Sequence, residues 1–276
     1  MKYCDLHIHS TASDGTFTPE QIVERAYNLG LSGIAITDHD TIAAVAEGRA
    51  EAEKRGIEYI PALEISSSEL EGRMHILGYF IDIDEPLLTS LLAKLIASRE
   101  KRVSEICEKM GEIGLNCGIE DIEKISNGAT IGRPHLAQYL IDNGVVRDIR
   151  EAFGRYLAVG RPLYVRKWAP SPREAIDTIH HARGLAVLAH PGATPGAMDM
   201  LPYMAQLGID GVEAYYPRQS HEAQQRAIEY AKEFGLAVTG GSDCHGTRRG
   251  DPLLGVFKVR FDLLEKLRDA WREKYV

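Results

Sequence analysis

Polar and apolar residues alternate strictly over the segment Asp5-Leu6-His7-Ile8-His9-Ser10. Alternation with a period of two is typical of a strand, in which successive side chains point to opposite faces. Asp5, His7 and His9 would then share one face, whereas on a helix His7 and His9 would point about 200° apart. The pattern therefore predicts a strand that directs two imidazoles toward one place.

The remainder of the first 85 residues repeats the order of strand, polar loop and helix. Thr18, Pro19 and Gln21 predict a helix start, because they combine a capping box with proline at the first helical position. Short apolar runs predict further strands at 33–40, 59–65 and 73–80. This order favours an α/β architecture with parallel strands.

The alternation of strands and helices stops between residues 86 and 160. Large aliphatic residues recur there at helical spacing, and no strand-like run interrupts them. Gly132-Arg133-Pro134-His135 opens a shorter helix within this stretch. We expect an all-helical insertion at 86–160 in a domain built from 1–85 and 161–276. After Pro172 strands and helices alternate again, up to a final amphipathic helix.

Composition and charge exclude several classes of protein. The 276 residues are 44% hydrophobic and 26% charged, which is ordinary for a globular protein. The net charge of −8 is unfavourable for a protein that coats long nucleic acid. The segment 133–173 is nevertheless basic, with eight Lys or Arg against three Asp or Glu, and this suits a small phosphorylated substrate or a short oligonucleotide.

Compartment and redox chemistry can also be inferred from the sequence. No apolar run approaches membrane-spanning length, and the first residues lead into a strand rather than a signal peptide, so we expect a cytoplasmic protein without a membrane partner. A monomer is favoured. Four cysteines without C-x-x-C spacing indicate neither a disulfide framework nor a cysteine zinc site. Cys107 and Cys117 are interpreted as core residues or free thiols.

Nine polar residues stand at or just beyond the ends of predicted strands. In a parallel βα barrel the carboxyl ends of the strands meet on one face, where active sites form. Any one of these residues alone would be an ordinary polar residue, but six of the ten histidines belong to the set. The nine residues are His7, His9, Asp14, His39, Glu64, His75, His190, Asp243 and His245.

These nitrogen and oxygen donors predict a site for two to three divalent metal ions. If one carboxylate bridges, the nine ligands make about ten bonds, or roughly three for each of three metals, which leaves open positions for catalysis. Glu64 is our choice for the bridge. The donor set suits zinc, manganese or iron, and the excess positive charge favours an anionic substrate such as a phosphate. Asp5 is a candidate acceptor for orienting an imidazole.

The motifs D-L-H-I-H-S, I-T-D-H-D, the Glu64 strand, His75, A-H-P-G and G-S-D-C-H together resemble the PHP (polymerase and histidinol phosphatase) superfamily. The insertion with Gly132-Arg133-Pro134-His135 is similar to its stand-alone phosphoesterases, which include 3′,5′-nucleoside bisphosphate phosphatases and enzymes that trim short 5′-phosphorylated RNA. The resemblance implies a distorted (β/α)7 barrel, a trinuclear metal site, and phosphate binding by Arg133 and His135. Ala193 occupies a place where some bisphosphate-cleaving relatives carry arginine, which leaves the preferred substrate open.

We therefore expect a metal-dependent phosphoesterase acting on nucleotide phosphomonoesters, such as 3′,5′-bisphosphates or AMP, or on short 5′-phosphorylated oligonucleotides. In the hypothesis, a hydroxide bridging two metals attacks phosphorus, and Arg133 takes up charge on the phosphate oxygens. Lys167, where the insertion rejoins the barrel, is a further candidate substrate contact. The alternatives are a histidinol-phosphate phosphatase and a PHP module that binds metal without catalysis.

Overall fold

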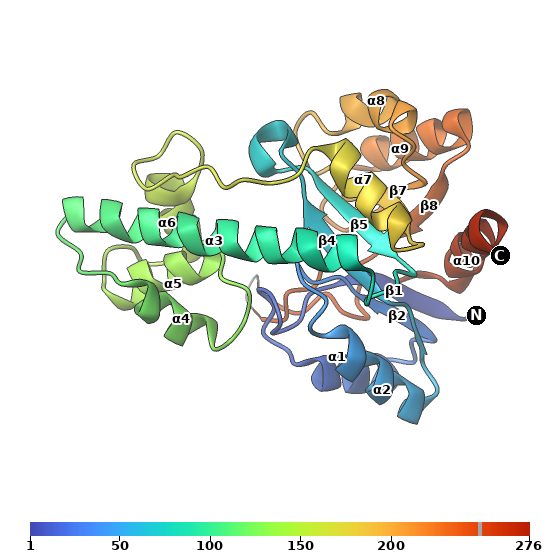
Figure 1. The fold of residues 1–276 in the computed structure, drawn as a ribbon. Helices are drawn as coiled ribbons and strands as arrows, with labels where there is room; N and C mark the ends of the chain where they lie inside the picture. The colour runs from blue at the N-terminus through green and yellow to red at the C-terminus, as the bar shows by residue number, and fades with distance from the viewer. Residues whose placement is uncertain (248–249) are drawn as a thin grey trace.

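The computed structural model describes residues 1–247 and 250–276, and its strands form two sheets (Figure 1). The four-stranded sheet has the order β3-β2-β1-β9, with β1 (Tyr3–Ile8), β2 (Gly33–Ile36), β3 (Glu58–Tyr59) and β9 (Val259–Arg260). The five-stranded sheet has the order β4-β5-β6-β7-β8, with β4 (Ala62–Ser66), β5 (His75–Tyr79), β6 (Leu185–Leu188), β7 (Gly211–Tyr215) and β8 (Ala237–Gly240). The fold is thus mixed α/β.

Backbone hydrogen bonds join the two sheets at one end, beyond β1, β2 and β8. After β1, the N–H of His9 donates to the carbonyl of Cys244 at 2.9 Å, beyond the end of β8. After β2, the N–H of Asp40 donates to the carbonyl of Glu64 in β4 at 2.9 Å. The segments that follow β1, β2 and β8 are therefore held beside the side chains of β4.

The expectation of parallel strands throughout is wrong for part of the fold. β5 runs antiparallel to both β4 and β6, and β9 runs antiparallel to β1. β4 and β5 are joined only by residues 67–74, which include the short 3-10 helix η1 (Glu69–Gly72). A link of this length can connect antiparallel neighbours, whereas a parallel crossover needs a dozen or more residues.

The predicted strand at 59–65 is divided in the structure. Its first residues belong to β3 of one sheet, and its last belong to β4 of the other. Pro61 lies between the two strands, and because proline lacks an N–H it cannot donate to a sheet ladder. The chain therefore changes sheets at this point.

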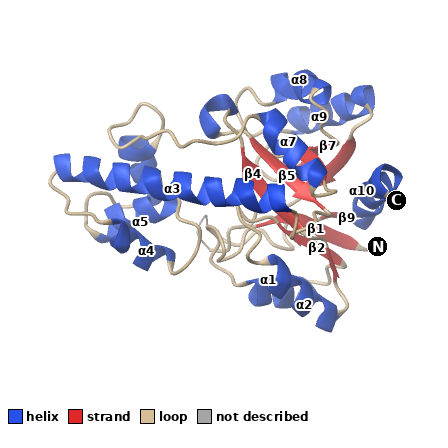
Figure 2. Cartoon of the chain, in the orientation of Figure 1, coloured by secondary structure: helices blue, strands red, loops and turns tan. Residues whose placement is uncertain are grey.

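Besides α3 (Pro86–Glu112), whose first half shares a core with β4 and β5, six of the described helices pack against the sheets (Figure 2). They are α1 (Pro19–Asn28), α2 (Val45–Arg55), α7 (Pro172–His181), α8 (Leu201–Gln206, preceded by the 3-10 helix η3, Met198–Met200), α9 (His221–Phe234) and α10 (Phe261–Tyr275). The predicted capping box of α1 is confirmed: Thr18 Oγ1 accepts from Gln21 N–H at 3.2 Å, and Gln21 Oε1 accepts from Thr18 N–H at 3.0 Å. None of the described helices is long and apolar enough to cross a membrane.

The chain from Pro86 to Leu157 is mostly helical. The first half of α3 packs into the core of the five-stranded sheet, and its second half extends with the following helices to one side of the sheets, at the left in Figure 1. It contains α3 (Pro86–Glu112), α4 (Ile119–Ser126), α5 (Arg133–Asp142), α6 (Ile149–Ala152) and the π-helical turn Phe153–Leu157 (η2). These elements share a hydrophobic core of their own, which includes Ile106, Met110, Ile122 and Leu136. We call residues 86–157 the helical segment. Its first helix, α3, follows β5 in the chain and leads to the other helices of the segment.

Candidate active site

The structure brings all nine predicted ligands into one cluster. β1 supplies His7, the loop after it supplies His9 and Asp14, β4 supplies Glu64, and β5 begins at His75. The segments after β2, β6 and β8 supply the others. Within the cluster, four overlapping groups have donor atoms within 4.8 Å of one another: His9, Asp14, His39 and His245; His7, Glu64 and His190; His7, His9 and Asp243; and His39, Glu64 and His75.

Glu64 lies at the centre of the cluster and is fully buried. Its Oε1 lies 2.9 Å from His75 Nδ1 and 3.1 Å from His190 Nε2. Its Oε2 lies 3.0 Å from His39 Nδ1 and 3.3 Å from His9 Nε2. One carboxylate thus contacts imidazoles from several different segments, which is the position that a bridging ligand requires.

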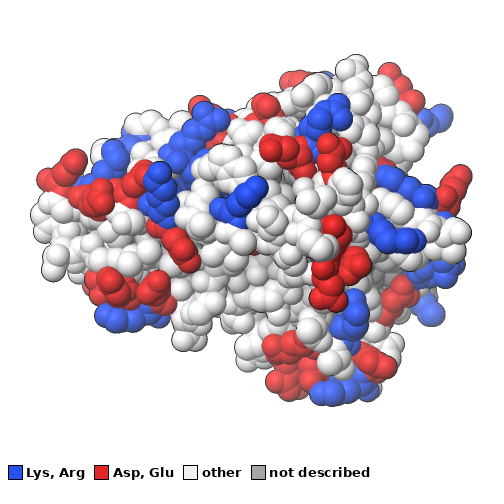
Figure 3. All heavy atoms as spheres, viewed as in Figure 1, with Lys and Arg blue, Asp and Glu red and all other residues white. Residues whose placement is uncertain are grey.

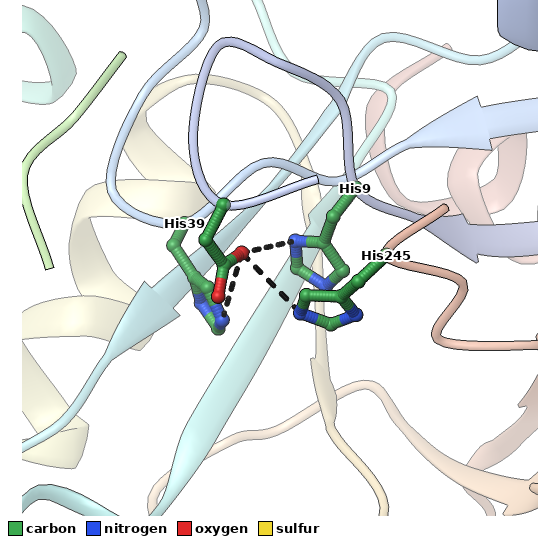
Figure 4. A group of neighbouring side chains, drawn as sticks. His9, His39 and His245 are labelled. Carbon is green, nitrogen blue, oxygen red and sulfur yellow. Dashed lines mark ion pairs between the residues drawn. The ribbon is translucent and has the colours of Figure 1, made fainter. Parts of the chain in front are cut away.

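Two further carboxylates lie beside the imidazoles on the side of His245. Asp14 Oδ1 lies 3.3 Å from His245 Nε2 and 3.9 Å from His9 Nδ1 (Figure 4). Asp243 Oδ1 lies 3.1 Å from His9 Nε2 and 3.4 Å from His245 Nδ1. The side chains in Figure 4 point toward one another although they come from opposite ends of the chain.

The donor atoms of this cluster fit a metal centre better than a hydrogen-bond network. Among the described residues, eleven buried side-chain nitrogen or oxygen atoms lack a hydrogen-bond partner, and five of them belong to the cluster. His7 Nε2 and His9 Nε2 also face each other at 3.1 Å. Buried polar atoms without partners are costly unless a cation satisfies them. The five atoms are His9 Nδ1, Asp14 Oδ1, His39 Nδ1, Glu64 Oε2 and His245 Nε2.

Burial and charge shift the pKa values of the cluster in opposite directions. Burial alone would lower the pKa of His9, but the Asp243 and Glu64 carboxylates raise it to about 9. Burial dominates at His39 and lowers its pKa to about 4. The surrounding imidazoles outweigh the effect of burial on Glu64 and hold its pKa well below the ordinary value. Carboxylates that stay ionised inside a protein need nearby positive charge, which protons on histidine or metal ions can supply.

Glu213 was missed in the sequence, although it is fully buried beside the cluster. His7 Nδ1 donates to its Oε1 at 2.9 Å, and the backbone N–H of His190 donates to its Oε2 at 2.8 Å. A carboxylate on Nδ1 fixes the tautomer that leaves Nε2 free as a ligand. The only signal in the sequence was an acidic residue within the apolar strand β7.

The expectation that Asp5 orients an imidazole is wrong. Its Oδ1 accepts from the backbone N–H groups of Ser242 at 2.9 Å and His7 at 3.3 Å. It therefore ties β1 to the segment after β8, and Glu213 occupies the position beside the His7 ring. Burial raises the pKa of Asp5 to about 7, against the lowering effect of these hydrogen bonds.

A cavity of about 220 Å³ lies between the cluster and the helical segment. Asp14, His39 and His75 line it on the side of the cluster. Four basic residues line the other side: Arg99 and Arg102 of α3, Arg133 at the start of α5, and Lys167. Phe153, Tyr164 and the acidic Glu71 also line it, and the guanidinium of Arg133 lies 5.5 Å from the centre of the Phe153 ring. We call this space the basic cavity.

The charges around the basic cavity are crowded and partly desolvated. Burial, together with the neighbouring Arg133 and Arg99, lowers the pKa of Arg102 to about 9. Burial also lowers the pKa of Lys167, to about 7. Arg102 Nε is one of the buried atoms that lack a hydrogen-bond partner in the described chain. An anion in the cavity would relieve this repulsion.

Lys167 and His135, two of the predicted substrate contacts, have protein partners. Lys167 Nζ lies 2.9 Å from Asp40 Oδ2. His135 is buried, and its Nδ1 accepts from the N–H of Gly132 at 3.1 Å, so the imidazole caps its own helix. Arg133, by contrast, lines the basic cavity and also a second cavity of about 240 Å³ over Glu64, His190 and Asp243.

Comparisons with known proteins agree with this arrangement. The PHP domain model matches residues 5–238. A 5′-3′ exoribonuclease of Haemophilus influenzae is 39% identical over 250 residues, which are 88% of this chain and 90% of that protein. A 3′,5′-nucleoside bisphosphate phosphatase of Chromobacterium violaceum is 33% identical over 279 residues, which are 99% of this chain and 96% of that protein.

Solved structures show the same fold. A candidate metal-dependent phosphoesterase from Bifidobacterium adolescentis has a TM-score of 0.88 and 30% identity, over 97% of this chain and 96% of that one. An amidohydrolase from Chromobacterium violaceum, with bound sulfate and no metal, has a TM-score of 0.81 and 30% identity, over 93% and 97% of the two chains. The fold and the cluster define a PHP-type α/β protein. The chain belongs to the PHP domain family.

Proposed function

We propose that this chain, a metal-dependent phosphoesterase, hydrolyses nucleotides or short oligonucleotides that carry a second, terminal phosphate. The observation that carries the proposal is the contact between the basic cavity and the cluster, which share Asp14, His39 and His75. A substrate with two phosphate groups can place one among the cations and the other at the cluster. One relative is named a 3′,5′-nucleoside bisphosphate phosphatase and another a 5′-3′ exoribonuclease, and a substrate with two phosphates and a nucleic-acid substrate both support the proposal.

We also propose that the nine residues of the cluster hold two to three manganese, zinc or iron ions, with Glu64 shared between them. Metals bound there would lower the pKa of water and neutralise charge at the phosphate that is cleaved. The donor-rich groups around Asp14, Glu64 and Asp243 support this assignment. Residues 1–85 and 161–276 would form the distorted (β/α)7 barrel, and 86–160 would form the substrate cap.

The basic cavity would bind and orient the phosphate that is not cleaved. Arg133 offers a planar fork with parallel N–H donors, which matches two phosphate oxygens. Arg102 brings a buried, unpaired Nε to the same cavity. Lys167 is a point charge whose lowered pKa makes it sensitive to a nearby anion. Together these residues would favour a terminal phosphate, with its higher charge, over an internal phosphodiester.

The face drawn in Figure 3 does not suit a long nucleic acid. Lys and Arg side chains are interspersed there with Asp and Glu, over both the helical segment and the region of the sheets. Long strands bind mainly through continuous positive charge. A short substrate held by a few partly buried cations is therefore the better match to the charges of this protein.

The test combines elemental analysis of the purified protein with phosphate and nucleotide release from a substrate panel. The panel contains pAp, AMP, histidinol phosphate, and di- to pentanucleotides with and without a 5′-phosphate, each with Mn²⁺ or Zn²⁺. We expect bound metal, and turnover at least tenfold faster for pAp or the 5′-phosphorylated oligonucleotides than for the 5′-hydroxyl ones. Preference for histidinol phosphate would favour the alternative phosphatase, and a metal-free protein without turnover would refute the proposal.

A further inference from the structure

Two cysteines of the helical segment have their sulfur atoms in direct contact. Cys107 lies in α3 and Cys117 in the connection between α3 and α4, and their Sγ atoms are 2.8 Å apart. This distance is less than 1 Å longer than the ~2.05 Å of a disulfide bond. Both cysteines are free thiols in the structure. The sequence alone favoured unconnected thiols, because the two residues have no recognisable motif spacing.

The backbone holds the pair together without help from the sulfur atoms. After α3 the chain reverses at Gly114, whose φ is +81°, and Leu115 N–H donates to Met110 O at 3.0 Å. On the other side, Tyr139 of α5 donates its hydroxyl to the carbonyl of Asn116 at 2.7 Å. Cys117 is therefore fixed beside Cys107 by contacts on both of its flanks. A bond between the sulfurs would require only a small local adjustment.

We propose that Cys107 and Cys117 form a dithiol that oxidises to an intrachain disulfide, with a hydroperoxide as the oxidant. The sulfur of Cys117, the more exposed of the two, attacks a peroxide oxygen, which gives a sulfenic acid and water when the peroxide is hydrogen peroxide. Cys107 then attacks the Cys117 sulfur, and the sulfenic oxygen leaves as a second water. Two thiols and one hydrogen peroxide thus yield one disulfide and two waters. Burial raises the pKa of both thiols, so the reaction is slow at neutral pH.

The bond would join two parts of the core that supports the basic cavity. Cys107 belongs to the same hydrophobic core as Ile106 and Met110 of α3 and Leu136 of α5, and α5 begins with Arg133. Closing the loop 107–117 would restrict the unfolded chain more than the folded one. The oxidised protein should therefore resist unfolding of the helical segment. This inference concerns stability and does not depend on the proposed function.

The test uses the whole protein treated with hydrogen peroxide at pH 8 and then alkylated under denaturing conditions. Trypsin cleaves after Lys109, between the two cysteines, so the disulfide would link the peptides 103–109 and 110–124. We expect two alkylated thiols instead of four, a linked peptide pair that dithiothreitol separates, and a rise in Tm of about 5 °C. Cys4 and Cys244, which are 0% and 2% exposed, should keep their thiols.

Cys107→Ser and Cys117→Ser are the matched controls. Each has three thiols before treatment and lacks one partner of the disulfide, so neither should gain Tm on treatment or yield the linked peptides. The readout on the unsubstituted protein is sufficient even if one of the variants fails to fold. Four reactive thiols after treatment, or a disulfide that joins other cysteines or two chains, would overturn the inference.

Discussion

The Asp40 carboxylate accepts a hydrogen bond from Arg99 Nε at 2.8 Å, although the two residues are 59 positions apart. Asp40 follows His39 of the cluster directly, and Arg99 belongs to α3 of the helical segment. Lys167 contacts the same carboxylate oxygen, and the N–H of Ser66 donates to the other oxygen at 2.7 Å. One buried carboxylate thus ties the basic cavity to the loop that positions His39.

Replacing that carboxylate should destabilise the protein. Burial would raise the pKa of Asp40, but Arg99 and Lys167 hold it far below its ordinary value, so the group is ionised at neutral pH. In Asp40→Asn two largely buried cations would lose their counter-charge, which costs about 3–5 kcal/mol. We expect a fall in Tm of roughly 10 °C in thermal unfolding, with partial recovery in phosphate buffer. Asp262→Asn, which removes an exposed partner of Arg260, should change Tm little; equal effects would contradict the assignment.

Arg133 should favour substrates with a terminal phosphate through the geometry of its guanidinium as well as through its charge. Arg133→Ala removes charge-assisted hydrogen bonds worth about 1.5–3 kcal/mol, so kcat/KM for a 5′-phosphorylated dinucleotide should fall about 100-fold. Arg133→Lys keeps the charge without the fork and should lose about tenfold. Activity on a 5′-hydroxyl dinucleotide should change much less. The exposed Arg161 provides the control: Arg161→Ala should behave like the unsubstituted protein. Equal losses on both dinucleotides would show that Arg133 does not read the terminal phosphate.

Glu213 should act through His7 and His190 on metal affinity. Glu213 accepts one hydrogen bond from the His7 ring and one from the backbone N–H of His190. In Glu213→Gln one of the two accepting oxygens becomes an amide NH2 group, which cannot accept. The variant then loses the bond to His190, or it forces His7 into the tautomer with its proton on Nε2, where a ligand lone pair is needed. Metal affinity should fall about 10- to 100-fold in a competition titration with a chelating dye. Glu229→Gln, at an exposed position of α9, should bind as before. Unchanged affinity of Glu213→Gln would remove this positioning role.

The residues of the cluster were more predictable from sequence than the sheets that hold them. A histidine or carboxylate at the end of an apolar run keeps its place at a strand end whichever neighbour the strand pairs with. Strand direction, in contrast, depends on how far the chain must travel, and the break at Pro61 and the short link 67–74 determined it here. The periodicity of polar and apolar residues within a strand does not predict whether its neighbour runs parallel or antiparallel.

The partners of charged residues were the least predictable part of the site. Asp40 and Arg99 are separated along the chain by α2, the strands β3, β4 and β5, and the first half of α3, so no spacing rule connects them. Glu213 looked like an isolated acidic residue in a strand until the fold placed it beside His7. Long-range pairs of this type are set by tertiary packing, which is why sequence reasoning identified the residues of the cluster and missed the residues that support them.

Acid stability should depend on Asp210, which lies directly before β7 and pairs with Lys274 of α10. Burial would raise the pKa of Asp210, but His180, Lys274 and the N–H of Ala186 together lower it. A carboxyl whose pKa is lower in the folded state stabilises the protein above its unfolded pKa of about 3.9, and this contribution is lost as the pH falls toward the folded value. Asp210→Asn should therefore lower the free energy of unfolding at pH 7 and show a smaller further loss between pH 5 and pH 3. Urea unfolding at each pH measures both effects. Asp269→Asn, whose side chain is 74% exposed, should follow the unsubstituted protein throughout, and parallel pH profiles for Asp210→Asn and the unsubstituted protein would rule out this role.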